Sequence, residues 1–558
     1  MGLSTLDITV VIAYAIGIFA LAQYVSREKA GHQKDTSDYF LASKSLPWWA
    51  IGASLIAANI SAEQIVGMAG SGYAIGLAIA SYEWMAALTL LIVGKWFLPI
   101  FLRNGIYSMP QFLEQRFGSN IRTLMAVFWL ALYIFVNLTS ILWLGSIAVN
   151  RVAGVNQDLA IVGLGAFALL YQLRGGLKAV ALTDIVQVTL LVAGGLLVSG
   201  ITLSQLGGDA GILGGLTKLT TSLPEHFHMI LPPSSEHYSK LPGLSVLIGG
   251  MWIANLSYWG FNQYIIQRAL AAKNIAEAQK GVVFAAFLKL LMPVIVVVPG
   301  IAAVMLAPGL PVADDAYPTM LRYLPSGILG LVFSALVAAI IASTASKINS
   351  IATIFTLDLY AKFKTDPNAP AQAGDVAEPK VDEKSPAQAT RERELVRVGR
   401  VAALTATVIA ILITRPLLGS LDQAFQYIQE FTGFFTPGIV VMFMLGLFWK
   451  RATEAGAIAA AVASVLLSAL FWAIGNYAPE WFTGNALTET MLVPFMNRMV
   501  VVFLASLLLA VVVSLAVPDK REKNFIVTRD VSFATPASFN MAALGVVLIL
   551  IALYATYW

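Results

Sequence analysis

Seven polar side chains lie near the middle of long apolar segments, where lipid would offer them no hydrogen-bond partner. They are Asn59, Gln64, Glu83, Asn255, Lys289, Gln426 and Gln429. Together they supply amide donors and acceptors, one carboxylate and one ammonium, so their formal charges cancel. Such a set suits a neutral polyol, and Tyr258 adds an aromatic surface for the apolar side of a ring. The predicted chemistry is reversible recognition without a covalent step.

Ionisable side chains inside apolar segments each cost several kcal/mol unless they are paired or hydrated. Six occur in this chain: Glu63, Glu83, Asp184, Lys289, Lys347 and Glu430. A structural ion pair or a position at a helix end is a plausible explanation for Asp184 and Glu430. It is a weak explanation for Glu83 and Lys289, because each lies roughly 12 Å into its segment at about 1.5 Å per residue. We expect these two near the bilayer midplane.

The composition places these groups in a polytopic membrane protein. Of the 558 residues, 58% are hydrophobic and 12% are charged, whereas soluble domains carry about 25% charged residues. Several apolar stretches exceed the roughly 20 residues that span a bilayer. A soluble globular protein and a disordered one are therefore excluded. The absence of cysteine excludes disulfides, thiolate metal sites and cysteine nucleophiles.

Fourteen spans are predicted to position the polar groups. Their approximate limits are 5–24, 47–72, 75–102, 119–149, 157–173, 179–206, 242–267, 277–307, 326–361, 398–418, 422–449, 453–476, 494–517 and 535–557. We expect the first span to be retained as a helix and not cleaved as a signal peptide. Its apolar run is preceded by Asp7 and by no Lys or Arg, whereas a signal peptide begins with basic residues. Most Lys and Arg residues then fall on one side, which marks the cytoplasm. Both termini are predicted to face outside.

The second and seventh spans carry polar interruptions that are marked by glycines. They read LPWWAIGASLIAANISAEQIVGMAGSG and VLIGGMWIANLSYWGFNQYIIQ. Close helix packing explains glycines alone. Glycines beside Asn, Gln and Glu favour a cavity, because lipid cannot satisfy a broken backbone. Two matched interruptions, five helices apart, indicate an inverted-repeat transporter with its site at the midplane.

The chain resembles the sodium/solute symporter family, and specifically its sodium–glucose branch. The similar stretches, SLPWWAIGASLIAANISAEQ, SGYAIGLAIASYEWM, ANLSYWGFNQYIIQRALAAK, FAAFLKL, INSIATIFTLDLY and QAFQYIQEFTG, extend over most of residues 35–455. The resemblance implies an all-α membrane protein with a 5+5 inverted-repeat, LeuT-like fold and flanking helices. It also implies sodium-coupled symport of a neutral monosaccharide, galactose or glucose, across a bacterial inner membrane. Sodium is the implied coupling ion, with no organic cofactor.

Five regions are expected from this organisation. They are 1–46 (an extra helix and a cytoplasmic loop), 47–206 (the first repeat), 207–241 (an outer loop), 242–449 (the second repeat) and 450–558 (extra helices). Residues 362–400 of the second repeat are rich in Ala, Pro, Lys and Glu. Because that composition cannot bury a core, we expect a disordered cytoplasmic tether there.

The resemblance also assigns roles to single residues. The implied sugar contacts are Asn59, Gln64, Glu83, Asn255, Lys289 and Gln429. Tyr258 corresponds to an inner-gate tyrosine that closes below the sugar. The implied outer hydrophobic gate consists of Met68, Tyr82 and Phe425. Ala86 stands where the family has a serine contact, which leaves the choice between galactose and glucose open.

The implied sodium site uses backbone carbonyls and hydroxyls. Its positions are Ala57, Ile60, Ala339, Ala342 and Ser343. Sodium is a hard cation that wants oxygen ligands, and Ala342 replaces a hydroxyl residue, so one ligand of five is missing. Lys347 lies four residues after Ser343 on the same helix face, where the family usually has an apolar residue. Asp184 matches an acidic residue of a second sodium site in some members.

Three interpretations of Lys347 are open. In the first, sodium still binds at Ser343 and Lys347 snorkels to the cytoplasmic end of its helix. In the second, Lys347 pairs with Asp184 and abolishes only the second sodium site. In the third, Lys347 takes the place of sodium, and transport is sodium-independent or proton-coupled.

Other classes of protein are less consistent with the sequence. A membrane enzyme would need a metal-ligand spacing or a nucleophile–base arrangement within the spans, and neither is evident. His226 and His228, near Glu225, are more typical of a solvated loop than of a metal site. A sensor would carry a cytoplasmic signalling domain, and a channel is also disfavoured. A symporter for inositol, a sugar acid or an amino acid stays open. No nucleic-acid partner is expected, and the oligomeric state is undetermined.

Overall fold

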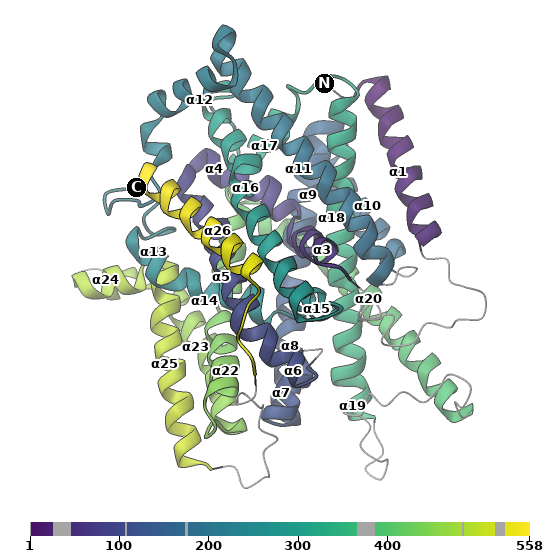
Figure 1. Ribbon diagram of the computed structural model, residues 1–558, viewed down its shortest axis with the longest axis vertical. Coiled ribbons are helices and arrows are strands. Elements are labelled where there is room, and N and C mark those ends of the chain that lie inside the picture. Colours follow the sequence, from purple (N-terminus) through teal and green to yellow (C-terminus); the bar gives the residue numbers. More distant parts are fainter. Residues whose placement is uncertain are drawn as a thin grey trace.

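The computed structural model describes residues 2–25, 46–106, 109–172, 177–364, 386–482, 485–518 and 531–558. These residues are almost entirely helical, and one isolated bridge joins Leu46 to Ala272. Helices are expected of apolar segments in lipid, because a helix satisfies its own backbone hydrogen bonds. Figure 1 shows long helices gathered into one bundle, with α22, α23 and α25 side by side at one edge.

The first half of the chain forms the following elements: α1 (Thr5–Val25), α3 (Trp48–Asn59), η2 (Glu63–Gly67), α4 (Met68–Ala74), η3 (Leu77–Ala80), α5 (Ser81–Ile92), η4 (Val93–Phe97), α6 (Leu98–Arg103), α7 (Met109–Arg116), α8 (Ser119–Ala131), η5 (Leu132–Leu138), α9 (Thr139–Ala153), α10 (Gln157–Gln172), α11 (Leu177–Gly207), η6 (Gly208–Ala210), α12 (Gly211–Ser222) and η7 (Pro224–Phe227). The short segments η2, η4 and η5 are π-helical turns inside longer helices. Such turns are frequent at functional sites.

The second half forms these elements: α13 (Leu244–Ile248), α14 (Gly250–Asn255), η8 (Leu256–Gly260), α15 (Gln263–Leu270), α16 (Ile275–Leu306), η9 (Ala313–Asp315), α17 (Ala316–Leu321), α18 (Ile328–Thr353), η10 (Ile354–Tyr360), α19 (Ala361–Phe363), α20 (Pro386–Leu418), α21 (Ala424–Thr432), α22 (Thr436–Phe448), α23 (Glu454–Tyr477), η12 (Pro479–Trp481), α24 (Ala486–Leu492), α25 (Phe495–Ala516) and α26 (Ala537–Thr556).

Each predicted span coincides with a helix or with an interrupted series of helices. Within the described residues, nine helices are long and apolar enough to cross a bilayer, and eleven if each bent pair is one span. Two shorter apolar helices, Thr5–Ile18 and Gln157–Leu170, coincide with further predicted spans. The seventh predicted span is divided among α13, α14, η8 and α15. The total of fourteen membrane crossings therefore stays a prediction.

The interruption that the sequence predicts in the second span is present. Helix α3 ends at Asn59, Ile60 is extended with φ −69° and ψ 108°, and the two halves of the span meet at 66°. The Ser61 hydroxyl accepts a hydrogen bond from the Glu63 amide at 3.2 Å. Serine is favoured at the start of a helix because its side-chain oxygen accepts a hydrogen bond from a backbone amide that has no partner within the helix.

The seventh span is also interrupted, at Gly249 and again at Asn262, which is extended with φ −85° and ψ 122°. A further bend of 42° between α21 and α22 was not predicted. The sequence signal for it is present in Gly433 and in Pro437, which lies in the first turn of α22. Proline favours the start of a helix, where its missing amide proton costs nothing.

Small residues bring the site-bearing helices close together. A Cβ atom on Gly300 of α16 would lie 2.1 Å from the Ala69 carbonyl oxygen of α4. A Cβ atom on Gly52 of α3 would lie 2.5 Å from the Phe284 ring of α16. Such contacts at small residues are typical of membrane helix packing. They fix α16 against both halves of the broken second span.

The predicted tether is wrong for residues 386–400. These residues form the beginning of α20, which runs from Pro386 to Leu418. Their sequence is rich in Ala, Arg, Glu and Gln, which are good helix formers, and the apolar part of α20 extends the same helix. The Glu394 carboxylate also accepts a hydrogen bond from the Tyr360 hydroxyl at 2.6 Å. Residues 365–385 of the predicted tether lie outside the described residues.

A candidate solute chamber beside a candidate ion site

A cavity lies where the interrupted helices meet. Its lining includes every predicted sugar contact and the predicted inner-gate tyrosine: Asn59, Gln64, Glu83, Asn255, Tyr258, Lys289 and Gln429. These residues come from α3, η2, α5, α14, η8, α16 and α21, so the fold gathers side chains that are far apart in sequence. Ala86 also lines the cavity. The structure therefore forms the polar chamber that the sequence predicts.

The chamber has members that sequence reasoning missed. Trp129, Thr432 and Thr436 also line it. Trp129 lies in α8, and no polar interruption or glycine near it in the sequence pointed to the chamber. Thr432 and Thr436 flank the unpredicted bend between α21 and α22, and recognition of that bend would have pointed to them. Gln426 was grouped with the midplane candidates, but it is not among the residues that line this cavity.

The charged centre of the chamber is an ion pair between Lys289 and Glu83. The Lys289 Nζ atom lies 2.5 Å from Glu83 Oε2 and also donates a hydrogen bond to Asn59 Oδ1. It lies 5.0 Å from the centre of the Trp259 ring. Lys289 is 1% exposed and Glu83 is 3% exposed. A buried pair of this kind is tolerated only with good geometry and additional hydrogen bonds, and both are present here.

A chain of hydroxyls lies below this centre. The Asn59 Nδ2 atom donates to the Tyr258 oxygen at 3.1 Å, and the Tyr264 hydroxyl donates to the same oxygen at 2.6 Å. The Tyr133 hydroxyl donates to Asn262 Oδ1 at 2.9 Å, and the Tyr133 and Tyr264 rings meet edge to face. Tyr258 is therefore held between the chamber and a second aromatic layer.

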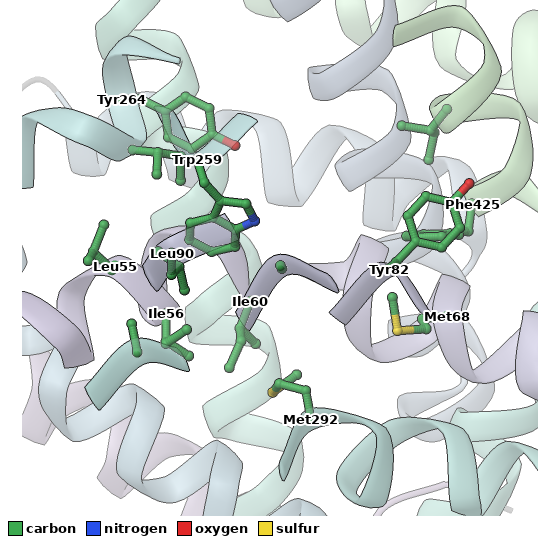
Figure 2. Packing of buried hydrophobic residues seen from close by; sticks show 14 of the residues in the cluster. Leu55, Ile56, Ile60, Met68, Tyr82, Leu90, Trp259, Tyr264, Met292 and Phe425 are labelled. Carbon is green, nitrogen blue, oxygen red and sulfur yellow. The ribbon is translucent and has the colours of Figure 1, made fainter. Parts of the chain in front are cut away.

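The residues of the predicted outer gate lie together on another side of the chamber. Figure 2 shows Met68, Tyr82 and Phe425 grouped there, away from Trp259 and Tyr264. The rings of Tyr82 and Phe425 meet edge to face, with centroids 5.2 Å apart. All three gate residues are buried. The contact places an apolar layer against the polar chamber, and the role of this layer as an outer gate stays a prediction.

The candidate ion site lies at the broken end of α3. The Ser343 hydroxyl donates to the Ile60 carbonyl oxygen at 3.4 Å, which brings α18 against the interruption. The last carbonyls of a helix lack intrahelical partners and carry partial negative charge. Ala57 lies in the last turn of α3, and Ala339 and Ala342 lie on α18 beside Ser343. Carbonyl and hydroxyl oxygens suit a sodium ion, so these residues fit one, although the Ala342 side chain supplies no oxygen.

Lys347 is buried beside this site. It is 3% exposed, and its Nζ atom donates to Asn137 Oδ1 at 3.2 Å. The same atom lies 4.0 Å from the centre of the Tyr264 ring and 5.7 Å from that of Tyr133. These contacts hold the ammonium inside the protein, so the expectation that Lys347 snorkels to the cytoplasmic end is wrong. Sodium binding at Ser343, the other part of that interpretation, stays a prediction. The side chain of Asp184 lies outside the described residues, so the pairing of Lys347 with Asp184 stays a prediction.

Two other predicted groups have clear surroundings. Glu430 forms an ion pair with Arg498 of α25, which confirms the expected structural pairing. At η7, His226 Nε2 lies 3.3 Å from the Tyr73 carbonyl oxygen, and His228 Nδ1 lies 3.0 Å from that of Trp558. Both histidine rings thus contact backbone oxygens, which gives each an ordinary structural role.

A helical membrane bundle with a polar chamber at its interrupted helices defines a membrane transporter. A family model, the sodium:solute symporter family, matches residues 39–373 and 383–464. The chain belongs to this family, and it is a transporter rather than an enzyme.

Two relatives show how far the similarity extends. The chain is 48% identical over 576 residues to a sodium/glucose cotransporter of Vibrio parahaemolyticus, a match that covers 100% of this chain and 99% of the relative. It is 34% identical over 493 residues to sodium/myo-inositol cotransporter 2 of Bos taurus, which covers 83% of this chain and 69% of the relative.

Solved structures show the same fold. A substrate-bound, outward-open Na⁺-coupled sialic acid symporter matches with a TM-score of 0.71 at 20% identity, over 93% of this chain and 99% of that one. The nucleobase-cation-symport-1 family transporter Mhp1 in a closed conformation matches with a TM-score of 0.52 at 14% identity, over 87% and 97%. The chain therefore has the LeuT-like inverted-repeat fold that the sequence predicts.

Proposed function

We propose that this chain is a sodium-coupled symporter for a neutral monosaccharide, galactose or glucose. The observation that carries the proposal is the chamber around Glu83 and Lys289, which adjoins the Ile60 carbonyl and the Ser343 hydroxyl. The amides and the neutral ion pair offer donors and acceptors for sugar hydroxyls. A wrong epimer would leave some of these buried groups unpaired, which is a strong source of specificity. The 48% identity to a sodium/glucose cotransporter supports the same assignment.

The proposed cycle is alternating access. Sodium binds first from outside, at the broken end of α3, and stabilises α3 against α18 in the outward-open state. The sugar then binds beneath Met68, Tyr82 and Phe425, the repeats rock, and Tyr258 moves aside toward the cytoplasm. Coupling requires that each ligand bind the transport-competent states preferentially, and it is reciprocal. The membrane potential supplies about 2.3 kcal/mol per charge per 100 mV, in addition to the sodium gradient.

We place the protein in a bacterial inner membrane with both termini outside, because most Lys and Arg residues then lie in cytoplasmic loops. The lipid bilayer is its environment, and sodium and the sugar are its small-molecule partners. A myo-inositol substrate is the second candidate. It is favoured by the 34% identity to a sodium/myo-inositol cotransporter.

Uptake of labelled galactose into proteoliposomes tests the proposal. An inward sodium gradient should drive accumulation, and replacement of sodium by choline should abolish it. Undiminished accumulation in choline would instead support the interpretation in which Lys347 replaces sodium. Unlabelled glucose should compete, inositol should compete only if the second candidate is right, and proline should not compete. A response to proline alone would overturn the sugar assignment.

A further inference from the structure

The buried ammonium of Lys347 joins three elements on the cytoplasmic side of the chamber. Lys347 belongs to α18, its hydrogen-bond acceptor Asn137 belongs to η5, and the ring beneath it, Tyr264, belongs to α15. Attraction between an ammonium and an aromatic ring is strongest where water is excluded. Because Lys347 is 3% exposed and Tyr264 is buried, this contact is of the strong kind.

Tyr264 connects the ammonium to the proposed inner gate. Its hydroxyl donates to the Tyr258 oxygen at 2.6 Å, and Tyr258 in turn accepts from Asn59 of the chamber. Arg268 Nε, one turn along α15, also donates to the Ser54 hydroxyl of α3 at 3.0 Å. A movement of Tyr264 therefore changes the contacts of Tyr258 directly.

The same helix carries both Lys347 and the hydroxyl of the ion site. Ser343 faces the Ile60 carbonyl oxygen, and Lys347 lies one helical turn further along α18. Residues four apart share a helix face and move together. Any shift of α18 away from α3 on the release of sodium therefore also moves the ammonium relative to Tyr264.

The nearby carboxylate of Glu63 is engaged by serine hydroxyls and forms no direct hydrogen bond with this ammonium. Glu63 attracts Lys347 electrostatically. However, its Oε1 accepts from the Ser140 hydroxyl, and its Oε2 accepts from the Ser61 hydroxyl at 3.3 Å. Lys347 is thus held by one amide oxygen and by ring faces, and not by a direct hydrogen bond to a carboxylate.

We propose that Lys347 is a positioning residue that holds the inner gate shut by clamping Tyr264, and thereby Tyr258, until the ion leaves the Ser343 side of α18. The proposal rests on the proposed function only for the identity of the ion as sodium. The substrate class of the chamber does not enter it. Lys347 acts through tyrosines and contacts neither the cavity nor its solute.

A single thiol reports the state of the gate without any measurement of transport. The chain has no cysteine, and Ala254 lines the chamber. We therefore suggest labelling Ala254→Cys with an impermeant maleimide from the cytoplasmic side, with and without sodium. In this parent, sodium should slow labelling. Adding Lys347→Met should raise the labelling rate in sodium about 30-fold, the size expected for loss of one buried ammonium–ring contact of about 2 kcal/mol. Lys347→Arg should keep the parental rate, because a guanidinium also stacks on tyrosine.

A second variant tests the contact from the other side. Tyr264→Leu removes the ring and should raise labelling as Lys347→Met does. The double variant should label no faster than either single variant, because both remove the same interaction. An unchanged labelling rate in Lys347→Met or in Tyr264→Leu would overturn the clamp. Additive increases in the double variant would overturn it as well.

Sugar flux separates this proposal from the proposed function. If both are right, Lys347→Met vesicles should release preloaded galactose in the presence of sodium several-fold faster than wild-type vesicles, and the two should be equally fast without sodium. If the wild-type protein accumulates no galactose with sodium but the labelling results hold, the proposed function fails and the clamp stands. If wild-type uptake needs sodium but labelling is insensitive to both variants, the clamp fails and the proposed function stands.

Discussion

Among the described residues two lysines, Lys289 and Lys347, are buried, and they are held in different ways. Lys289 lies against the Glu83 carboxylate at 2.5 Å and also bonds Asn59, so its charge is compensated within the chamber wall. Lys347 bonds the neutral Asn137 and lies over the Tyr264 ring. A hydrogen bond between two charged groups is stronger than one to a neutral amide, so Lys289 is held more strongly than Lys347. Lys289 is thus part of the chamber wall, whereas we propose that Lys347 responds to the ion bound near Ser343.

The largest effect is expected when Lys289 loses the carboxylate that neutralises its charge. Glu83→Gln keeps the shape of the side chain but leaves the Lys289 ammonium buried without a countercharge, which typically costs about 3–5 kcal/mol. Sodium-driven galactose uptake should fall at least about 100-fold, and thermal stability should fall with it. Asp158→Asn, at an exposed ion pair with Arg415, is the matched control and should transport normally. Normal uptake by Glu83→Gln would contradict the chamber.

The ion site comes next in expected effect. Ser343→Ala removes the hydroxyl that faces the Ile60 carbonyl. The sodium concentration for half-maximal uptake should rise about tenfold, since one hydrogen-bonding oxygen is worth about 1–1.5 kcal/mol. Ala342→Ser adds an oxygen on the same helix and should shift the sodium dependence in the opposite direction. Sodium titrations of uptake that show no change in either variant would place the ion elsewhere.

Glu63→Gln tests how strongly Lys347 depends on the carboxylate near it. The amide keeps an acceptor for the Ser140 hydroxyl and removes the charge that attracts Lys347. Because Lys347 has no direct bond to this carboxylate, uptake should fall only about threefold, far less than for Glu83→Gln. Parallel uptake assays of the two variants check the order. Equal losses would show that both lysines depend on their carboxylates alike.

The comparison extends to Asp314, a buried carboxyl group that forms no ion pair with a basic side chain among the described residues. Asp314, in η9 between α16 and α17, accepts from the Ala424 amide through Oδ2, and its Oδ1 has no partner among the described residues. Burial raises the pKa of Asp314 well above its usual value, and Asp422 and Asp315 add to the rise. An acid with a higher pKa in the folded state binds more protons when folded, so stability falls as pH rises from about 4 toward the raised pKa.

Asp314→Asn should therefore flatten the fall in thermal stability with rising pH. At pH 8 we expect its melting temperature to exceed that of the wild type by about 1–2 °C, the smallest effect of the series. Melting curves of the detergent-solubilised protein at pH 5 and pH 8 measure it. Parallel pH profiles for the two proteins would contradict an uncompensated charge at Asp314.

Much of the fold was predictable because apolar length and periodicity are local properties. The helices match the predicted ranges, and the interruption after Asn59 was visible as polar residues beside glycines. The beginning of α20 was not predicted, because composition alone cannot distinguish a polar helix that extends an apolar one from a free tether. The bend between α21 and α22 was also missed, since Gly433 and Pro437 alone do not require one.

The sequence by itself determined a membrane transporter, the interruptions of its second and seventh spans and most of the polar residues of its chamber. These follow from the cost of placing polar groups and broken backbone in lipid. Only the tertiary structure decided what each lysine contacts. Lys289 and Lys347 look alike in the sequence, and both lie in long apolar helices. Packing of α16 against α5 gave Lys289 a carboxylate, whereas packing of α18 against η5 and α15 gave Lys347 an amide and an aromatic ring. Contacts between residues more than 80 positions apart depend on how helices pack, and no local pattern encodes them.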